Sequence, residues 1–388
     1  YTKFGDVPYT TKVLSIKESM SIARTAKATV IANVLADLDE VINGNYLPTS
    51  YDADNKGRIT RWAAMAIKAK IYLFEGNWTQ VKNITSTIMT EGGFKLFGSY
   101  AGLFEIANEY NSEVILDAQY RPTSREHQMM YVFLPPTLGG YSQLSPLQEL
   151  VDSYIMLDGK TIKETGTSFD ESHPYANRDP RLKATVMYTG NSYTLADGTE
   201  VVINCEKGEG KDGYGVGSDC SATGYYIKKY WDNTYRATLY SGLNPILIRY
   251  ADILLMNAEA LAELGELDKT AWDATIKPIR DRAGFTLTSA VEFPEGASKD
   301  KLIEIVRNER RSELALEGHR HKDIIRWRIA DNVLNGWCHG LKTNDVVGTD
   351  DGYVRVENRA FNANRHYLWP IPQAERDLNG NLEQNPNW

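Results

Sequence analysis

Residues 309–320 have the sequence ERRSELALEGHR, in which charged and apolar side chains alternate. Opposite charges three and four residues apart stabilise a helix, and the apolar positions between them can be buried. Asp323, Arg326 and Trp327 follow at the spacing of a second helix. This pattern predicts a partly buried ion network that fixes one helical hairpin against another.

Further helical hairpins are expected on both sides of this segment. Residues 60–92 and 247–284 each contain two apolar stripes at helical spacing, separated by a glycine. We expect a third pair at 298–335 and a single helix at 19–43. Two helices of about 15 residues with a short turn, found twice, are similar to tetratricopeptide units of about 34 residues. Pro278 lies inside one expected helix and should kink it.

The middle of the chain differs from this helical pattern. Short strands are expected at 113–120, 200–204 and 225–231, and residues 206–224 contain six glycines and form a loop. We therefore expect a mainly α fold with a loop-rich region that contains short β-strands. The expected organisation is a single domain (1–388) with a helical scaffold at 19–92 and 247–335, a loop-rich ligand-binding region at 113–246 and an extended tail at 353–388.

Composition argues against several classes of protein. The 388 residues include 43 basic and 51 acidic side chains, so the net charge of −8 disfavours binding to a nucleic-acid backbone. The mean hydropathy is −0.42, and no apolar run approaches the roughly 20 residues that span a bilayer. Six histidines and three cysteines leave little for a metal cluster or a thiol enzyme. No Walker loop or Gly-x-Ser-x-Gly motif is present, and we expect no catalytic residue.

Two cysteines bracket the glycine-rich loop. Cys205 and Cys220 could form a disulfide, which would close a loop of about 15 residues and be worth roughly 3 kcal/mol; two free thiols are the alternative. Cys338 is expected to be a lone buried thiol. A structural Ca²⁺ ion is conceivable in the same loop, because Glu206, Glu209, Asp212 and Asp219 supply hard oxygens, but their spacing does not match an EF-hand.

Short motifs follow one another through the whole chain. They are FGDVP at 4–8, GRITRWAA at 57–64, YANRDPRL at 175–182, RYADILL at 249–255 with AEA at 258–260, RDRAG at 280–284, ERRSELA at 309–315 with Gly318 and Arg320, LWPIP at 368–372 and QNPNW at 384–388. In this order they resemble the motifs of the SusD/RagB family of bacterial surface glycan-binding lipoproteins. Asp252 stands where that family has glutamate.

This resemblance implies a location and a partner. Family members sit on the outer membrane as surface-exposed lipoproteins, pair with a SusC-like TonB-dependent transporter, and deliver oligosaccharide or polysaccharide to it without chemistry. They carry a lipidated cysteine and a helical segment before FGDVP. This chain has neither, so membrane attachment is expected only through an anchor outside it, and part of a binding site is expected to be missing.

The ligand-binding residues are expected outside the motifs, where aromatic side chains cluster. Flat aromatic rings bind the apolar face of a sugar, and polar side chains bind its hydroxyls. We expect Trp231 and Tyr235 to stack on sugar, helped by Tyr193 or Tyr214, and Asp232, Asn233 and Arg236 to contact hydroxyls. The alternative is that these aromatic rings only pack the core. Residues 131–141 are a second candidate, as an exposed apolar loop that touches either the ligand or the transporter.

Two other functions remain open at this point. An all-helical glycoside hydrolase would use two carboxylates at a defined separation, which a sequence with 51 acidic residues does not specify. A peptide-binding repeat adaptor would present a continuous concave groove of helices. Glycan capture differs from both, since it requires an open aromatic surface and no cleavage.

Overall fold

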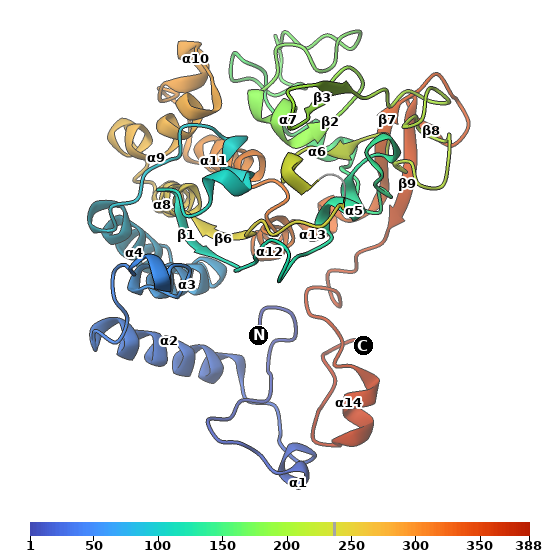
Figure 1. Ribbon diagram of the computed structural model, residues 1–388. Helices are drawn as coiled ribbons and strands as arrows, with labels where there is room; N and C mark the ends of the chain where they lie inside the picture. Colours follow the sequence, from blue (N-terminus) through green and yellow to red (C-terminus); the bar gives the residue numbers. More distant parts are fainter. Residues whose placement is uncertain (236–237) are drawn as a thin grey trace.

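The computed structural model describes residues 1–235 and 238–388 and is mainly helical (Figure 1). The helices are α1 (Ile16–Ser19), α2 (Lys27–Asn43), α3 (Arg61–Phe74), α4 (Trp78–Glu91), α5 (Met129–Phe133), α6 (Gln148–Val151), α7 (Pro180–Thr185), α8 (Tyr250–Leu264), α9 (Lys269–Ala283), α10 (Thr288–Val291), α11 (Lys299–Glu313), α12 (Arg320–Arg326), α13 (Ala330–Val333) and α14 (Gln373–Leu378). No helix in the described ranges combines the length and the apolar character needed to cross a membrane.

Small antiparallel sheets accompany the helices. The strands are β1 (Val114–Asp117), β2 (Val186–Met187), β3 (Ser192–Thr194), β4 (Glu200–Val202), β5 (Tyr226–Ile227), β6 (Ile246–Arg249), β7 (Gly336–Lys342), β8 (Thr349–Asp350) and β9 (Tyr353–Arg359). β1 pairs with β6, β2 with β5 and β3 with β4, and β9 lies between β7 and β8.

The two predicted helical hairpins, α3–α4 and α8–α9, are both present. Asn77 begins α4 by accepting a hydrogen bond from the Gln80 backbone N–H, and Asp268 begins α9 in the same way. Gly265 ends α8 with a positive φ of 74°, which glycine adopts without strain. α9 runs through Pro278 to Ala283. Both hairpins bury an apolar face against each other, and α8 lies against α4.

The predicted ion network is present, and it is fully buried. Arg249 Nη1 lies 2.6 Å from Glu313 Oε1 and 2.7 Å from Glu113 Oε1. Arg181 Nη2 lies 2.7 Å from Asp179 Oδ2, and the Asp179 side chain also caps the start of α7. Arg181 reaches Glu313 as well, at 2.8 Å. The charged residues of the motifs thus join α11, α7 and β6 in the interior of the molecule.

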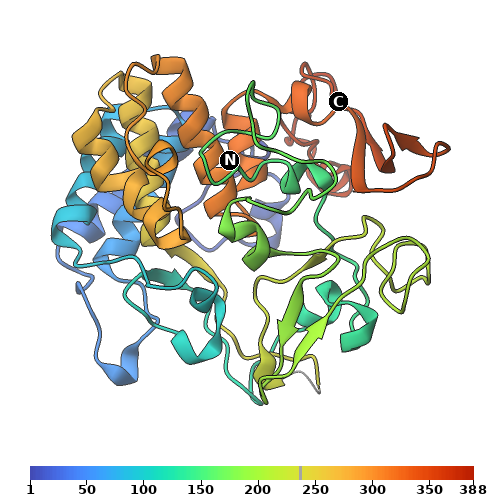
Figure 2. The ribbon, with the colours of Figure 1, turned by 90° about the horizontal axis from the view of Figure 1, so that it is seen from above.

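The helical scaffold and the loop-rich half lie side by side, as the view from above shows (Figure 2). The helices of the scaffold occupy one side, and the segments from about 100 to 245 form most of the other. The largest core cluster belongs to the loop-rich half and contains many tyrosines, including Tyr154, Tyr193, Tyr225 and Tyr226. The clusters of the scaffold are mostly aliphatic.

Two sequence-based expectations need correction. The first helix was expected from residue 19, but α2 begins at Lys27, and α1 is a separate turn that Ser15 caps. The tail 353–388 is not extended throughout, since it contains β9 and α14. Strand β7, which pairs with β9, follows the expected third helical pair directly and was not expected; its pairing contains two register shifts, which interrupt the alternation of side chains that indicates a strand.

Of the two alternatives left open for Cys205 and Cys220, the structure has the free thiols: no disulfide joins them, and all three cysteines are free. Cys205 is buried in the large core cluster, whereas the Cys220 thiol donates to the Lys211 carbonyl at 3.3 Å. The two side chains therefore have separate environments. Cys338 is buried, as expected.

Candidate functional site

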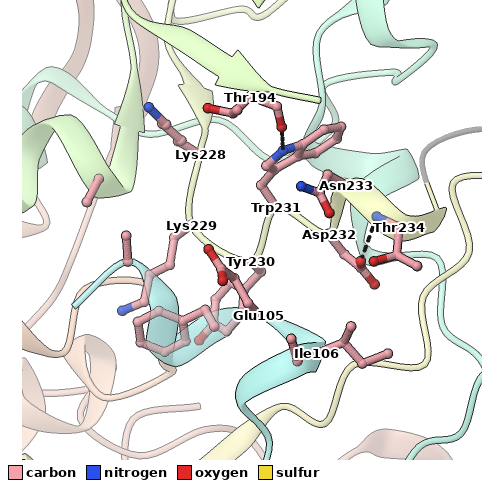
Figure 3. A pocket seen from close by; sticks show the side chains of 14 residues that line it. Glu105, Ile106, Thr194, Lys228, Lys229, Tyr230, Trp231, Asp232, Asn233 and Thr234 are labelled. Carbon is pink, nitrogen blue, oxygen red and sulfur yellow. Dashed lines mark hydrogen bonds between the residues drawn. The ribbon is translucent and has the colours of Figure 1, made fainter. Parts of the chain in front are cut away.

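A cavity of about 300 Å³ lies between residues 228–234 and the two short 3₁₀ helices at Gly102–Phe104 and Ile106–Asn108 (Figure 3). Its wall is completed by Ala184 of α7 and Thr194 of β3. Residues 228–234 follow β5 directly, so β2–β5 pairing fixes one end of this segment. We call this cavity the Trp231 pocket.

Trp231 is half-buried at the edge of this pocket, and its ring is held in place. The indole Nε1 donates to the Thr194 carbonyl at 2.9 Å, and the ring packs on Tyr193 with centroids 5.2 Å apart. The indole lies beside the Asn233 side chain (Figure 3). A ring fixed in this way loses little conformational entropy when a ligand stacks on it.

Asp232 and Asn233 differ although both line the pocket. Asp232 is 2% exposed, and its carboxylate accepts hydrogen bonds from the Thr234 N–H at 3.1 Å and the Ser241 hydroxyl at 2.6 Å. The oxygens of the Asp232 carboxylate are therefore used within the protein, where they stabilise residues 232–234. The expectation that Asp232 contacts sugar hydroxyls is corrected accordingly. Asn233 is exposed, so its amide is the better candidate for that role.

Three further predicted residues have other positions. Tyr193 is 0% exposed and donates to the Ile227 carbonyl at 2.8 Å, so its ring cannot stack on a ligand and that expectation is wrong. Tyr214 is partly buried against the same core and does not line the pocket. The backbone of Tyr235 belongs to the 3₁₀ helix Asn233–Tyr235, and Arg236 lies outside the described residues.

Two lysines that the sequence reasoning missed also line the pocket. Lys229 Nζ donates to the Ala315 carbonyl and to Glu317 Oε1, each at 2.7 Å, and burial lowers its pKa to about 8. Lys228 Nζ donates to Asn191 Oδ1 at 3.1 Å, and burial lowers its pKa. Lys229 connects the floor of the pocket to the buried ion network. In the sequence, the two adjacent lysines within an otherwise aromatic segment are the feature that could have indicated their place in the pocket.

An exposed aromatic surface lies in the second candidate segment. The rings of Tyr131 and Tyr141 have centroids 4.4 Å apart, and the Tyr141 N–H donates to the Tyr131 carbonyl at 2.9 Å. The Tyr240 hydroxyl accepts from Gln128. Tyr141 and Tyr240 are each 41% exposed. We call Tyr131, Tyr141 and Tyr240 the tyrosine shelf.

One hydrogen-bonded link connects the pocket with the shelf. Ser241, which follows Tyr240, donates to Asp232 and pairs through its backbone with His127, next to Gln128. Between these tyrosines, Phe133 and Leu134 are buried in the core. Residues 131–141 are therefore an anchored surface element and not a loose apolar loop.

The glycine-rich loop gives no support for a metal ion. In the described part of the chain, no group of three or more His, Cys, Asp or Glu side chains is placed to hold one. Asp212, one of the four acidic residues considered, accepts a hydrogen bond from the Thr137 N–H at 2.7 Å and is buried. Its oxygen serves to attach the loop to residues 135–137.

Comparison with known proteins gives consistent results. A sequence profile described as the SusD family matches residues 103–388. A SusD-like protein of Formosa agariphila is 28% identical over 355 residues, which cover 85% of this chain and 61% of that protein. The chain therefore spans less than two thirds of that relative's length.

Two crystal structures from Bacteroides fragilis have the same fold. One, described as a SusD-like carbohydrate binding protein, has a TM-score of 0.86 and 29% identity, and the match covers 98% of this chain and 76% of the chain in that structure. The other, a SusD-like protein, has a TM-score of 0.83 and 28% identity and covers 100% of this chain and 76% of its own. The predicted mainly α fold is confirmed.

Proposed function

Because the chain belongs to the SusD family, we propose that it is a non-catalytic glycan-binding protein that uses the Trp231 pocket and the tyrosine shelf. Proteins of this family bind their ligands without catalysis. The observation that carries the proposal for the site is the fixed, half-buried indole of Trp231 beside the exposed amide of Asn233.

The chemistry of a sugar suits these groups. A pyranose ring has apolar C–H faces and a rim of hydroxyls, so it stacks on a flat ring and bonds to neighbouring amides. In the pocket, Trp231 supplies the ring and Asn233 supplies the amide. Since hydroxyls of the ligand lose water on binding, we expect affinities in the micromolar to millimolar range, roughly −8 to −4 kcal/mol.

The tyrosine shelf extends this surface. Tyr141 and Tyr240 expose their rings, and the Ser241–Asp232 hydrogen bond joins the shelf to the pocket segment. When the sugar in the pocket is part of a longer glycan, the rest of that glycan extends across the surface of the protein. We propose that the shelf binds residues of such a chain beyond the one that occupies the pocket.

Family membership also suggests where the protein acts and with which partner. We propose that the protein acts at the cell surface, on the outer membrane, and delivers its glycan to a SusC-like TonB-dependent transporter. The support is family membership alone. Co-purification of this protein with a transporter from membranes of its host tests the pairing, and a transporter that never co-purifies after gentle solubilisation would count against it.

Native gel electrophoresis through a panel of polysaccharides tests glycan binding. We expect migration to be retarded by at least one polysaccharide and to be restored by Trp231→Ala, with Trp337→Ala as the matched control because Trp337 is exposed on β7. Prolonged incubation with the retained polysaccharide should release no new reducing ends. Release of such ends would indicate a glycoside hydrolase, and no retardation by any member would contradict glycan binding.

A further inference from the structure

A second cavity, of about 550 Å³, lies in the helical scaffold and shares no lining residue with the Trp231 pocket. It lies along α11 and reaches α12 and the turn that follows it. Its lining residues are Glu263, Asp300, Ile303, Glu304, Arg307, Asn308, Arg311, Arg320, Trp327 and Ile329. Three guanidinium groups therefore face a single cavity.

The acidic residues of the cavity leave two of these arginines unneutralised. Glu263 pairs with Arg307, with Arg307 Nη2 2.9 Å from Glu263 Oε1. Glu304 pairs with Lys301 at 3.1 Å, outside the cavity lining. Asp300 is exposed in the first turn of α11. The two remaining cations are Arg311 and Arg320.

Arg311 and Arg320 have almost no partners. Arg311 donates one N–H to the Glu149 backbone carbonyl. Across residues 1–235 and 238–388, no carboxylate lies within ion-pair distance of either guanidinium, and no group accepts a hydrogen bond from Arg320. Both side chains are only partly exposed. A guanidinium has five N–H donors, so most of these donors are left for a ligand.

The carboxylates nearest to the two arginines are already engaged. Glu149 Oε1 lies 2.8 Å from His339 Nδ1. Asp152 accepts from the Gln148 amide at 2.7 Å. Asp323 pairs with Arg310 at 3.0 Å and with Arg326 at 2.8 Å. Each of these carboxylates therefore already has a hydrogen-bond or ion-pair partner.

The electrostatics of Arg311 and Arg320 favour binding of an anion. Burial, followed by the charge of Arg320, lowers the pKa of Arg311 to about 10. Burial also lowers the pKa of Arg320. An anion between two such groups would relieve both effects, because it replaces their hydration and screens their repulsion. In addition, Arg307 Nε is buried without a hydrogen-bond partner.

From this geometry we infer that the cavity binds a carboxylate of a polypeptide segment, held by the paired guanidiniums of Arg311 and Arg320. Arginine forks match carboxylate oxygens in geometry, and charge-assisted hydrogen bonds are about twice as strong as neutral ones. Clusters of arginine are a recurrent means of recognising acidic peptide motifs.

The apolar lining distinguishes a polypeptide from an acidic sugar. Trp327 is 9% exposed, and the guanidinium carbons of Arg307 and Arg326 lie 4.8 and 4.9 Å from the centroid of its ring. No open ring face is therefore left there for a sugar. Ile303 and Ile329 supply the rest of the apolar wall. Aliphatic side chains beside an Asp or Glu fit such a wall, whereas a hydroxyl-covered sugar does not.

Fluorescence polarisation with a labelled, end-blocked Leu-Asp-Leu peptide tests the inference on the full chain. We expect it to bind at least about tenfold more tightly than the Leu-Asn-Leu peptide, and to bind more weakly as the salt concentration rises. Arg320→Gln should abolish this preference; since Arg320 makes no ion pair or hydrogen bond in the described residues and lies 5.9 Å from the Trp327 ring centroid, the variant is expected to fold. Arg311→Lys, which keeps the charge and loses the fork, should weaken it.

Arg328→Gln is the matched control, because Arg328 is exposed and lies over the ring of Tyr367, outside the cavity. It should leave peptide binding unchanged. Equal binding of the two peptides, no binding of the Asp peptide, or unchanged binding by Arg320→Gln would overturn the inference. Tighter binding of an oligogalacturonate than of the peptide at the same cavity would also overturn it, in favour of an acidic glycan. Glycan binding at the Trp231 pocket is measured separately and is unaffected by either result.

Discussion

The scaffold and the loop-rich half differ in the side chains that they bury. In the scaffold, charged motif residues are enclosed and paired, as in the ion pairs Arg249–Glu313 and Arg310–Asp252. In the loop-rich half, tyrosines dominate the core and a few aromatic rings remain at the surface. An enclosed ion pair fixes how elements are joined, whereas a surface ring is free to meet a ligand. Residues that hold the fold and residues that bind are therefore separate sets.

Removal of one member of the buried network gives the largest expected effect. Arg249→Met leaves the carboxylates of Glu113, Glu313 and Glu317 without that cation, and unpaired buried charges destabilise by about 3–5 kcal/mol. Urea denaturation measures the change. Lys269→Met is the control, because this exposed pair should contribute about 0–1 kcal/mol. Equal losses in the two variants would remove the distinction between the network and the surface pairs.

The pH dependence of stability gives a second test of the buried ion network, through the carboxylate of Glu317. Although burial alone would raise it, Arg249 and Lys229 hold the pKa of Glu317 at about 2. This pKa is below that of the unfolded chain, so the stabilisation is complete above about pH 5 and is lost as pH falls toward 2. We expect wild type to exceed Glu317→Gln by on the order of 3 kcal/mol at pH 7.

That difference should shrink steadily between pH 5 and pH 2, as measured by urea denaturation at a series of pH values. Glu304→Gln serves as the control, because Glu304 is exposed. A difference between wild type and Glu317→Gln that does not change with pH would show that Glu317 acts through packing alone.

The tyrosine shelf should show a smaller effect, and one that depends on the length of the ligand. Tyr141→Ala should weaken binding of a long oligosaccharide by roughly threefold to tenfold, since an aromatic contact is worth about 0.5–1.5 kcal/mol. Binding of a mono- or disaccharide should not change. Tyr46→Ala is the control, because Tyr46 is exposed and lies outside the shelf. An equal loss for short and long ligands, by isothermal titration, would place the shelf inside the primary site.

The smallest effect is expected from reducing agent. Since Cys205, Cys220 and Cys338 are free, dithiothreitol should leave the urea midpoint unchanged. A disulfide across a loop of about 15 residues would be worth about 3 kcal/mol. A clear fall in the midpoint on reduction would show that Cys205 and Cys220 pair in solution.

The sequence predicted the scaffold better than the site, for a physical reason. The charge pattern of residues 309–320 predicted an ion network because opposite charges three and four residues apart lie close enough on a helix to pair, with apolar positions between them. Strand β7 was not predicted, because two register shifts in its pairing with β9 interrupt the alternation of buried and exposed side chains. The two members of each hairpin were recognised from apolar stripes that span three or four turns.

The binding residues were harder to predict because an aromatic ring looks the same in a core and on a surface. Tyr193 and Trp231 are close to each other and in contact, yet one is buried and the other lines a cavity. Only the tertiary packing separates them. Arg311 and Arg320 belong to the motif that predicts the ion network, and only the three-dimensional structure shows that neither of them forms an ion pair in the described residues.

We propose that Trp231 binds sugar while the enclosed ion network maintains the fold. Isothermal titration of Trp231→Ala with an oligosaccharide that wild type binds, together with urea denaturation of the same samples, separates these two roles. We expect Trp231→Ala to lose affinity by about tenfold or more, equivalent to about 1.4 kcal/mol, while it remains folded, and Trp337→Ala to lose none. Unchanged affinity in folded Trp231→Ala would contradict it.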